Sequence, residues 1–409
     1  MRRISLLLAL LVILISGCSE SKSITIAVVS PEQGEILEQV FNNQYKKNTQ
    51  IEIKPILDSV EKVGEHWEEL DNIIAKYINE NNDVDLVFGF PPEYLAGLVE
   101  TGTIQSLNGK LDKKALYNFA PAIRMPIEEA GKGEIYAVTP TFNSYVLAYN
   151  KEIFAKSKIE EPKNSMSWED LYDLSVKLQQ NSKYKGLALG VPDSDEEFYY
   201  LYQILTRPIY SIEKVNNSIQ VNNEMNKKYW SLFTKIYMDN KKANLKEFLK
   251  GDVAMSVMPV ASIMDKELFN QFGDNNLDIG IVQMPVFQEI DGGLAYSDSL
   301  FALSTNSKSE EAATDFLNYI QGEEFANYLM EGSLLPTYWD TGVKETLIKK
   351  YGHDFSPIYD QGGALLTKPS IEADEYLKVE SAGAKFFTEY LNGKDTIDSL
   401  LTAYEEDVN

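Results

Sequence analysis

Three serines in this sequence are followed, three positions later, by a lysine. That spacing places a nucleophile and a base together in one class of acyl-transfer enzymes. The pairs are Ser59 with Lys62, Ser182 with Lys185 and Ser211 with Lys214. No Lys-Thr-Gly motif accompanies them, and no Gly-x-Ser-x-Gly elbow occurs. A pattern that recurs three times without its partner motif is not specific, so we expect no serine nucleophile.

Neighbouring acidic residues are also abundant. They include Glu68-Glu69, Glu128-Glu129 and Glu196-Glu197. A glycosidase needs two carboxylates that face each other across a cleft, whereas side chains adjacent in sequence point apart. We therefore interpret these pairs as solvated helix faces. The sequence therefore predicts no catalytic residue and favours a binding protein over an enzyme.

Metal and cofactor chemistry is equally unsupported by the sequence. The two histidines, His66 and His353, lie far apart, and a single cysteine cannot complete a Cys/His set. A Gly-rich phosphate loop is missing as well. We expect neither a metal site nor a cofactor.

The one cysteine, Cys18, stands at the end of an N-terminal targeting pattern. Arg2 and Arg3 precede an apolar run over residues 4–15, and Ser16-Gly17 supply the small residues before Cys18. The run is shorter than the roughly 20 residues that cross a bilayer. The pattern resembles a bacterial lipoprotein signal, which implies cleavage before Cys18 and lipidation, with palmitate among the acyl chains, of its sulfur. A mature protein of this kind is anchored in the cell membrane and faces outside the cytoplasm.

The net charge of the mature chain excludes some classes of binding partner. Removal of residues 1–17 takes Arg2 and Arg3 from the 38 basic side chains and leaves 36 against 62 acidic ones, a formal charge of −26. Such a surface repels nucleic acid and anionic lipid headgroups. Only Arg124 and Arg207 remain as arginines, which disfavours a polyanionic ligand.

The elements that position any site alternate between strand and helix. Apolar runs at 24–29, 51–56 and 84–88 predict strands, and helical periodicity follows Pro31 and again covers 67–79. This order predicts a mostly parallel, buried sheet whose ligand lies beyond the carboxyl ends of the strands. Ser30, residues 90–93 and the turn at Thr141 stand at those ends.

Residues 135–151 have extended character, after which a second set of strands and helices begins. A capping box at Ser167 to Asp170 opens a helix that runs to about residue 180. Strands are predicted at 186–189, 253–258, 279–282 and 299–304, with helices at 196–205, 222–239, from Ser309 and at 396–406. The 392 residues of the mature chain are too many for one core and favour two α/β lobes.

Five ordered segments resemble the family 1 extracellular solute-binding proteins of ABC importers. The clearest is Leu-Ala-Tyr-Asn-Lys at 147–151, followed by Pro162 and by Ser-Trp-Glu-Asp-Leu at 167–171. The others are Asp-Val-Asp-Leu-Val-Phe at 83–88, Gly-Glu-Ile-Tyr-Ala-Val-Thr-Pro at 133–140, Phe-Leu-Lys-Gly-Asp-Val-Ala-Met at 248–255 and Ser-Glu-Glu-Ala-Ala at 309–313. Together they span essentially the mature chain.

The resemblance implies a two-lobed type II periplasmic-binding-protein fold, related to maltose-binding protein, with three crossings between lobes. We place these crossings near 141–144, 258–261 and 303–306. Residues 24–142 and 260–304 then form lobe 1, residues 143–259 and 305–409 form lobe 2, and 18–23 form a tether. The implied function is capture of a small solute, most often an oligosaccharide, and its delivery to a membrane permease by a monomeric protein.

Candidate ligand-binding residues follow from the family positions and from sugar chemistry, because aromatic rings stack on pyranoses while carboxylates and amides bind hydroxyls. The candidates are Phe90, Pro91, Glu93, Asn143, Ser144, Tyr145, Tyr296, Asp298 and Trp339. Trp168, Trp67 and Trp230 are expected to be packing residues.

One departure from the family weakens the carbohydrate prediction. Where many sugar-binding members carry Gly-Pro-Trp, this chain has Met258-Pro259-Val260, so one stacking ring is missing. A polyamine, a peptide or another cation suited to an acidic cleft remains the alternative ligand. A sensor component and an envelope hydrolase are the alternative functions.

Overall fold

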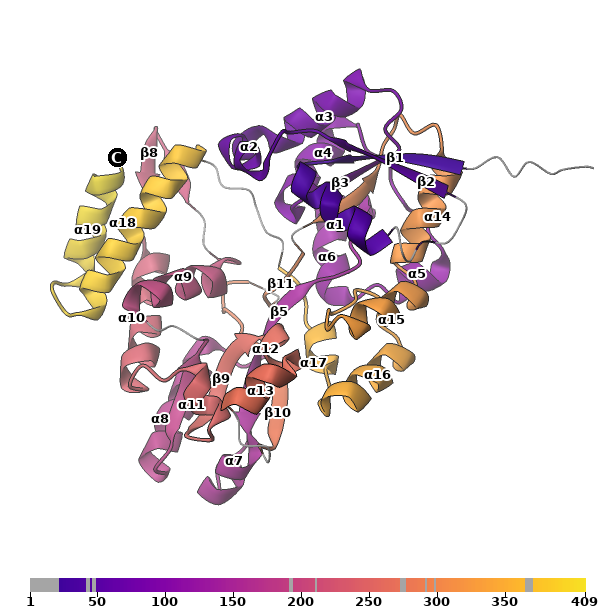
Figure 1. The fold of residues 1–409 in the computed structure, drawn as a ribbon. Coiled ribbons are helices and arrows are strands. Elements are labelled where there is room, and N and C mark those ends of the chain that lie inside the picture. The colour runs from indigo at the N-terminus through magenta and orange to yellow at the C-terminus, as the bar shows by residue number, and fades with distance from the viewer. Residues whose placement is uncertain are drawn as a thin grey trace, which may run out of the picture.

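The computed structural model of the chain describes residues 22–41, 45, 49–190, 194–209, 212–272, 277–290, 293–297, 299–364 and 371–409. Cys18 and Asp298 lie outside these residues. The described part folds as alternating strands and helices (Figure 1).

The strands are β1 (Lys22–Val28), β2 (Thr49–Pro55), β3 (Leu86–Phe90), β4 (Ala137–Val138), β5 (Asn143–Asn150), β6 (Lys185–Leu189), β7 (Glu213–Val215), β8 (Ser218–Gln220), β9 (Val253–Pro259), β10 (Ile279–Gln283), β11 (Ala295–Tyr296) and β12 (Leu300–Leu303). The helices of the first half are α1 (Pro31–Phe41), α2 (Val60–Glu65), η1 (Trp67–Glu69), α3 (Leu70–Glu80), η2 (Pro92–Tyr94), α4 (Leu95–Thr101), α5 (Lys113–Tyr117), α6 (Pro121–Ala130), α7 (Lys151–Ser157) and α8 (Trp168–Asn181). Those of the second half are α9 (Asp195–Thr206), α10 (Glu224–Asp239), α11 (Leu245–Leu249), α12 (Val260–Met264), α13 (Lys266–Phe272), α14 (Glu310–Ile320), α15 (Glu323–Glu331), α16 (Thr341–Tyr351), α17 (Ser356–Tyr359), α18 (Ala373–Leu391) and α19 (Ile397–Val408).

Two separate sheets organise the molecule into two lobes (Figure 1). The first sheet has the order β2-β1-β3-β12-β4, and α14 packs against its β1 and β12. The second has the order β10-β5-β9-β6, with α8 and α11 against it. The helices α18 and α19 join the second lobe through α9 and α10. We use first lobe and second lobe for these two groups of elements.

Both sheets are mixed, which differs from the mostly parallel sheets expected. In the first sheet, β1, β2 and β3 run parallel to one another, whereas β12 is antiparallel to β3. In the second sheet only β6 and β9 are parallel, while β5 runs antiparallel to β9 and to β10. In each sheet the antiparallel pairs involve the strand that directly follows a passage from the other lobe, which is β5 in the second sheet and β12 in the first.

The chain passes between the lobes three times within the part that the structure describes. The first passage, residues 139–142 between β4 and β5, lies close to the crossing predicted near 141–144. The second lies between β10 and β12, and the third between α16 and α18, with α17 in contact with both lobes. The crossings predicted near 258–261 and near 303–306 are wrong. The strands β9 and β10 belong to the same sheet, and α14 returns to the sheet that contains β12.

These passages distribute the chain differently from the predicted lobe boundaries. Within residues 260–304, β10 pairs with β5 in the second sheet and β12 with β3 in the first. Within residues 305–409, α14 packs on the first sheet and α18 on α9 of the second lobe. A strand of five apolar residues carries no signal of which sheet it joins, which explains the difference.

The local signals in the sequence nevertheless predicted most elements. The capping box is present: Asp170 N–H donates to Ser167 Oγ over 3.0 Å, and the Asp170 carboxylate accepts from Ser167 N–H over 3.2 Å. Trp168 and Trp230 are buried as expected, with exposed fractions of 0% and 1%. Both belong to the core of the second lobe.

Candidate functional site

The three inter-lobe passages lie side by side and are hydrogen-bonded to one another. The hydroxyls of Thr139 in the first passage and Ser297 in the second are 2.8 Å apart. Gly293 N–H of the second passage donates to the carbonyl of Gly362 in the third over 2.6 Å. Thr139 and Ser297 are both buried. The passages therefore form one hinge, and a rotation of the lobes must bend all three together.

Ser144, one of the predicted ligand residues, is built into this hinge. Its hydroxyl donates to the carbonyl of Leu294 over 2.9 Å and accepts from Gln361 Nε2 over 2.8 Å. Close packing continues at Gly363, where any Cβ would overlap the carbonyl oxygen of Ala122. Ser144 is only 3% exposed, so its polar atoms hold passages together and do not face open solvent.

An ion pair connects the two lobes directly. Arg207, at the end of α9, donates from Nη2 to Oε1 of Glu93, which lies in η2 beyond β3 of the first lobe. The Glu93 side chain is 9% exposed and that of Arg207 is 42% exposed. The guanidinium carbon also lies 5.9 Å from the ring centroid of Tyr296, within cation–π range. One predicted ligand residue is therefore paired with the single arginine of the second lobe's described residues.

The second oxygen of this carboxylate, Oε2, is also buried, and no donor among the described residues is hydrogen-bonded to it. Beside it, burial and then the Glu93 charge raise the pKa of Tyr94 well above its usual value. A buried acceptor without a donor costs stability, so such atoms often face a ligand or water in the working protein.

Two aromatic rings also contact each other across the interface between the lobes. Trp67 of η1 in the first lobe and Tyr376 of α18 in the second lie 4.5 Å apart between ring centroids, at 69° to each other. The indole Nε1 of Trp67 is buried and has no acceptor within the part of the chain that the structure describes. The interface between the lobes thus contains an unused donor at Trp67 and an unused acceptor at Glu93.

Two tyrosines lie at the hinge end of this interface. Tyr145 is 7% exposed, and burial followed by the neighbouring Tyr296 raises its pKa to about 12. Asn143 is exposed and pairs with Tyr296 in the β5–β11 ladder. A small apolar cavity adjoins them, lined by Pro92, Ile123, Pro126, Ile127, Ala295, Tyr296, Ser297 and Ala364.

On the second lobe, the helices α9 and α18 form the side of the interface that faces the first lobe. The two helices pack side by side (Figure 1). A Cβ on Gly383 would overlap the hydroxyl of Tyr199, and the charge of Arg207 acts on Tyr376. These two contacts fix an antiparallel register, which places Gln203 of α9 opposite Glu380 of α18. Glu380 follows Tyr376 by one helical turn and is therefore on the same face.

Burial raises the pKa of the Glu380 carboxyl. Among the described residues, none forms a hydrogen bond or ion pair with it. By contrast, Glu375 on the same helix is paired with Lys214 over 2.5 Å. We call Trp67, Glu93, Tyr145, Arg207, Tyr296, Tyr376 and Glu380 the inter-lobe cluster.

The predicted ligand residues divide between this cluster and other surroundings. Glu93, Tyr145 and Tyr296 belong to it. Phe90 is fully buried at the end of β3, where it pairs with Leu300, and Pro91 precedes η2. Trp339 is partly buried and stacks on Tyr359 at 3.7 Å and 7°, so that it packs against the core outside this cluster. Asp298 lies outside the described residues.

Four members of the cluster were missed in the sequence. Trp67 was expected to pack within its helix, but it contacts the facing lobe. Arg207, Tyr376 and Glu380 lie on helices whose packing partners are far away in sequence. The sequence offered one signal for these residues, which is the scarcity of arginine. Arg207 is one of only two arginines outside the N-terminal segment.

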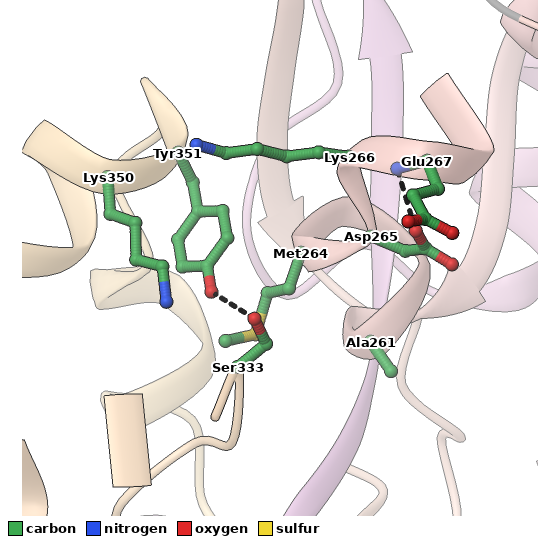
Figure 2. Close-up of a pocket in the computed structure, with 8 residues that line it drawn as sticks. All are labelled: Ala261, Met264, Asp265, Lys266, Glu267, Ser333, Lys350 and Tyr351. Atoms are coloured by element: carbon green, nitrogen blue, oxygen red, sulfur yellow. Dashed lines mark hydrogen bonds between the residues drawn. The ribbon is translucent and has the colours of Figure 1, made fainter. Parts of the chain in front are cut away.

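A second cavity, of about 440 Å³, opens where α12 and α13 approach α15 and α16 (Figure 2). Three of its polar side chains have hydrogen-bond partners, namely Tyr351, Ser333 and Lys350. Tyr351 donates to Ser333 over 3.0 Å, and the Lys350 ammonium donates to the carbonyls of Met330 and Glu331 at the end of α15. Figure 2 shows the Lys266 side chain extending over this cavity toward Tyr351. This cavity lacks the unused donor and acceptor that mark the inter-lobe cluster.

Two general features complete the description. Within the described ranges, no group of three or more His, Cys, Asp or Glu residues is arranged to hold a metal ion. None of the described helices is long and apolar enough to cross a membrane.

The fold is similar to that of solved solute-binding proteins. A sugar transporter protein of Rhizobium etli, in an open conformation, has a TM-score of 0.59 at 16% identity, covering 94% of this chain and 98% of its own. A family 1 extracellular solute-binding protein of Alicyclobacillus acidocaldarius has a TM-score of 0.63 at 13% identity, covering 94% and 97%. The cyclic α-maltosyl-1,6-maltose binding protein of Arthrobacter globiformis has a TM-score of 0.54 at 16% identity, covering 95% and 98%.

Sequence comparison gives the family. No curated protein sequence is significantly similar to the chain. The profile of the bacterial extracellular solute-binding proteins matches residues 43–340, which is well over half of the chain. That range contains the first two inter-lobe passages and both partners of the Glu93–Arg207 ion pair. With two lobes, three hinge passages and an inter-lobe cluster, the chain belongs to the bacterial extracellular solute-binding protein family.

Proposed function

We propose that the protein captures a saccharide between its lobes and delivers it to an ABC-type membrane permease. The observation that carries this proposal is the pair of unused polar atoms at the interface, the Trp67 Nε1 donor and the Glu93 Oε2 acceptor. A sugar hydroxyl is both donor and acceptor, so a single polyhydroxy ligand can satisfy both atoms.

The aromatic rings of the cluster support the same ligand class. Tyr145, Tyr296, Tyr376 and Trp67 offer apolar faces of the kind that stack on pyranose rings. Proteins of similar fold are described with cycloalternan, α-D-tagatose and D-mannitol as ligands. The ring missing after β9 is then replaced by rings from η1 and α18.

Capture requires that the lobes move. The ion pair and the Trp67–Tyr376 contact join the two lobes across the interface, and the hinge passages connect them beside Tyr296, which the Arg207 guanidinium approaches. A ligand that enters must separate these contacts and replace them with its own. Hinge closure around the ligand then gives the permease a conformation to recognise.

Anchoring beside the permease is the role proposed for Cys18. We expect the mature chain to begin at this residue, to carry lipid on its sulfur and to work as a monomer outside the cytoplasm. Replacement of Cys18 by Ser should release the protein from the membrane fraction into the medium. Retention of the C18S protein in washed membranes would contradict the anchor.

Thermal unfolding of the mature chain against a panel of saccharides, peptides and polyamines tests the function. A ligand at 100 times its Kd should add about 2.7 kcal/mol to the free energy of unfolding. We expect stabilisation by at least one saccharide and no turnover of it. Stabilisation by peptides alone would contradict the proposal, and product formation would favour the hydrolase alternative.

A further inference from the structure

We propose that the ligand carries a protonated amine and that Glu380 is the residue that selects it, with the rings of Tyr376 and Trp67 beside the amine. This inference rests on the proposed function and names the ligand more closely, as an amine-bearing saccharide. It is argued from the partners of the carboxylates at the interface.

The first step concerns the surroundings of Glu380. The register of α9 and α18 sets Gln203 and Arg207 of α9 level with the turn of α18 that holds Tyr376 and Glu380, and Trp67 of the first lobe contacts Tyr376. Gln203 uses its amide N–H on the hydroxyl of Tyr199 over 3.2 Å. Arg207 is engaged by Glu93. No donor of the described chain is therefore committed to the Glu380 carboxylate.

The second step concerns the burial of this carboxylate. Burial raises the pKa of the Glu380 carboxyl, and among the described residues no cation is paired with it. A half-buried carboxylate without a cation is unfavourable unless something supplies the positive charge. An ammonium group on a ligand supplies it.

The third step concerns the aromatic rings. Trp67 and Tyr376 meet nearly edge to face at 4.5 Å and come from opposite lobes. Tyr376 lies one turn from Glu380 on α18. Rings beside a carboxylate attract a cation through their π faces and exclude water from the charge pair. Closure on an amine would bring both rings and the carboxylate around it.

The fourth step is an independent observation on the facing lobe. The Glu93 side chain is more than nine-tenths buried, reaches across the interface to Arg207 and leaves Oε2 unpartnered. Glu93, Glu380 and Arg207 together bear one net negative charge. An incoming ligand therefore meets an excess of acceptors, which a neutral sugar fills with hydroxyls and an amino sugar fills with hydroxyls and a cation.

The test measures binding to the mature chain by titration calorimetry with saccharides matched except for one group. The pairs are glucosamine with glucose and the glucosamine disaccharide with cellobiose, and spermidine serves as an amine without a sugar. We expect the amine member of at least one pair to bind at least tenfold more tightly at neutral pH. The E380Q variant should lose that preference, so that the two members of the pair bind with affinities within threefold of each other.

The matched control is E375Q, on the same helix, because Glu375 is already paired with Lys214. This variant should keep the amine preference. Equal affinity within both pairs, or a preference that survives in E380Q, would overturn the inference and leave the saccharide function standing. Binding of spermidine alone, lost in E380Q, would support amine selection and contradict the saccharide function. Failure of every amine to bind would overturn the inference.

Discussion

At the residue scale, the inter-lobe cluster shows which side chains are placed for a ligand at the expense of stability. Glu380 is the clearest example, since burial raises its pKa and no partner compensates. In the folded state this carboxyl holds its proton to a higher pH than in the unfolded chain. Stability is therefore lost as pH rises from the ordinary carboxyl value of 4.5 through the raised value, and the loss is complete above it.

The first prediction follows from the loss of stability that the Glu380 carboxyl causes as pH rises. The E380Q variant should have a higher melting temperature than the wild type at pH 7, because glutamine carries no charge to desolvate. The difference should shrink as pH is lowered toward 4.5 and vanish below it. Differential scanning calorimetry at several pH values measures this. An E380Q protein that is less stable than the wild type at pH 7 would show that the carboxylate has a partner of its own.

A second prediction concerns the indole donor of Trp67. The W67F variant keeps an aromatic ring against Tyr376 but removes the N–H, so the affinity for ligand should fall about tenfold, the cost of roughly one hydrogen bond. The melting temperature should hardly change. W339F is the matched control, because Trp339 stacks on Tyr359 in the core. It should lower stability and leave affinity unchanged, and the reverse pattern would restore Trp339 as the ligand residue.

The sequence predicted part of this site. Glu93, Tyr145 and Tyr296 were found because they follow strand ends or precede a crossing, and strand ends converge in an α/β lobe. Trp67 and Glu380 could not be found in the same way. Their role depends on which faces of η1 and α18 meet across the interface, and a single sequence does not contain that information.

At the element scale, buried polar contacts fix how the strands and helices are joined. Asp85, in the loop before β3, is 3% exposed and accepts from four donors. Oδ2 accepts from Thr25 N–H over 2.9 Å, and Oδ1 accepts from Ser307 Oγ over 2.7 Å and from the N–H groups of Lys308 and Ser309. One carboxylate thus ties β1 to the start of α14, which lies more than 200 residues further along the chain.

The third prediction tests this connection. The D85N variant should lose about 3 kcal/mol in free energy of unfolding, because its amide places donors against donors in a buried site. Urea denaturation measures the loss. Asp83, two residues earlier, pairs with Lys54 at the surface, so D83N should leave the midpoint almost unchanged. Equal effects of the two substitutions would show that the Asp85 contacts do not stabilise the fold.

The positions of helices and strands along the sequence were easier to predict than the contacts between them in space. Periodicity and the capping box located α8, β9 and α14 to within a few residues, because those signals are local. The sheet that β10 joins and the lobe that α14 covers depend on contacts between residues far apart in sequence. This is why two of the three crossings were placed wrongly while the strands on either side of them were correct.

At the scale of the whole molecule, the Glu93–Arg207 pair should set how far the lobes separate without ligand. The fourth prediction is that E93Q increases the radius of gyration of the unliganded protein in solution scattering, because the lobes lose the ionic contact that joins them across the interface. Addition of ligand should abolish the difference. The variant K214Q breaks a pair that lies within one lobe and should leave the scattering unchanged. An E93Q curve identical to wild type would show that the ion pair does not control lobe separation.

The three hinge passages also determine when the protein can fold. The first sheet is incomplete until β12 at Leu300–Leu303 has been made, and the second lobe must wait for α18 and α19 at the end of the chain. Contacts between residues this far apart form slowly, and a growing chain cannot complete either lobe early. Late completion leaves the chain extended for most of its synthesis, which is the state in which a polypeptide can be threaded through a secretion channel. The interwoven lobes thus make export and folding successive events.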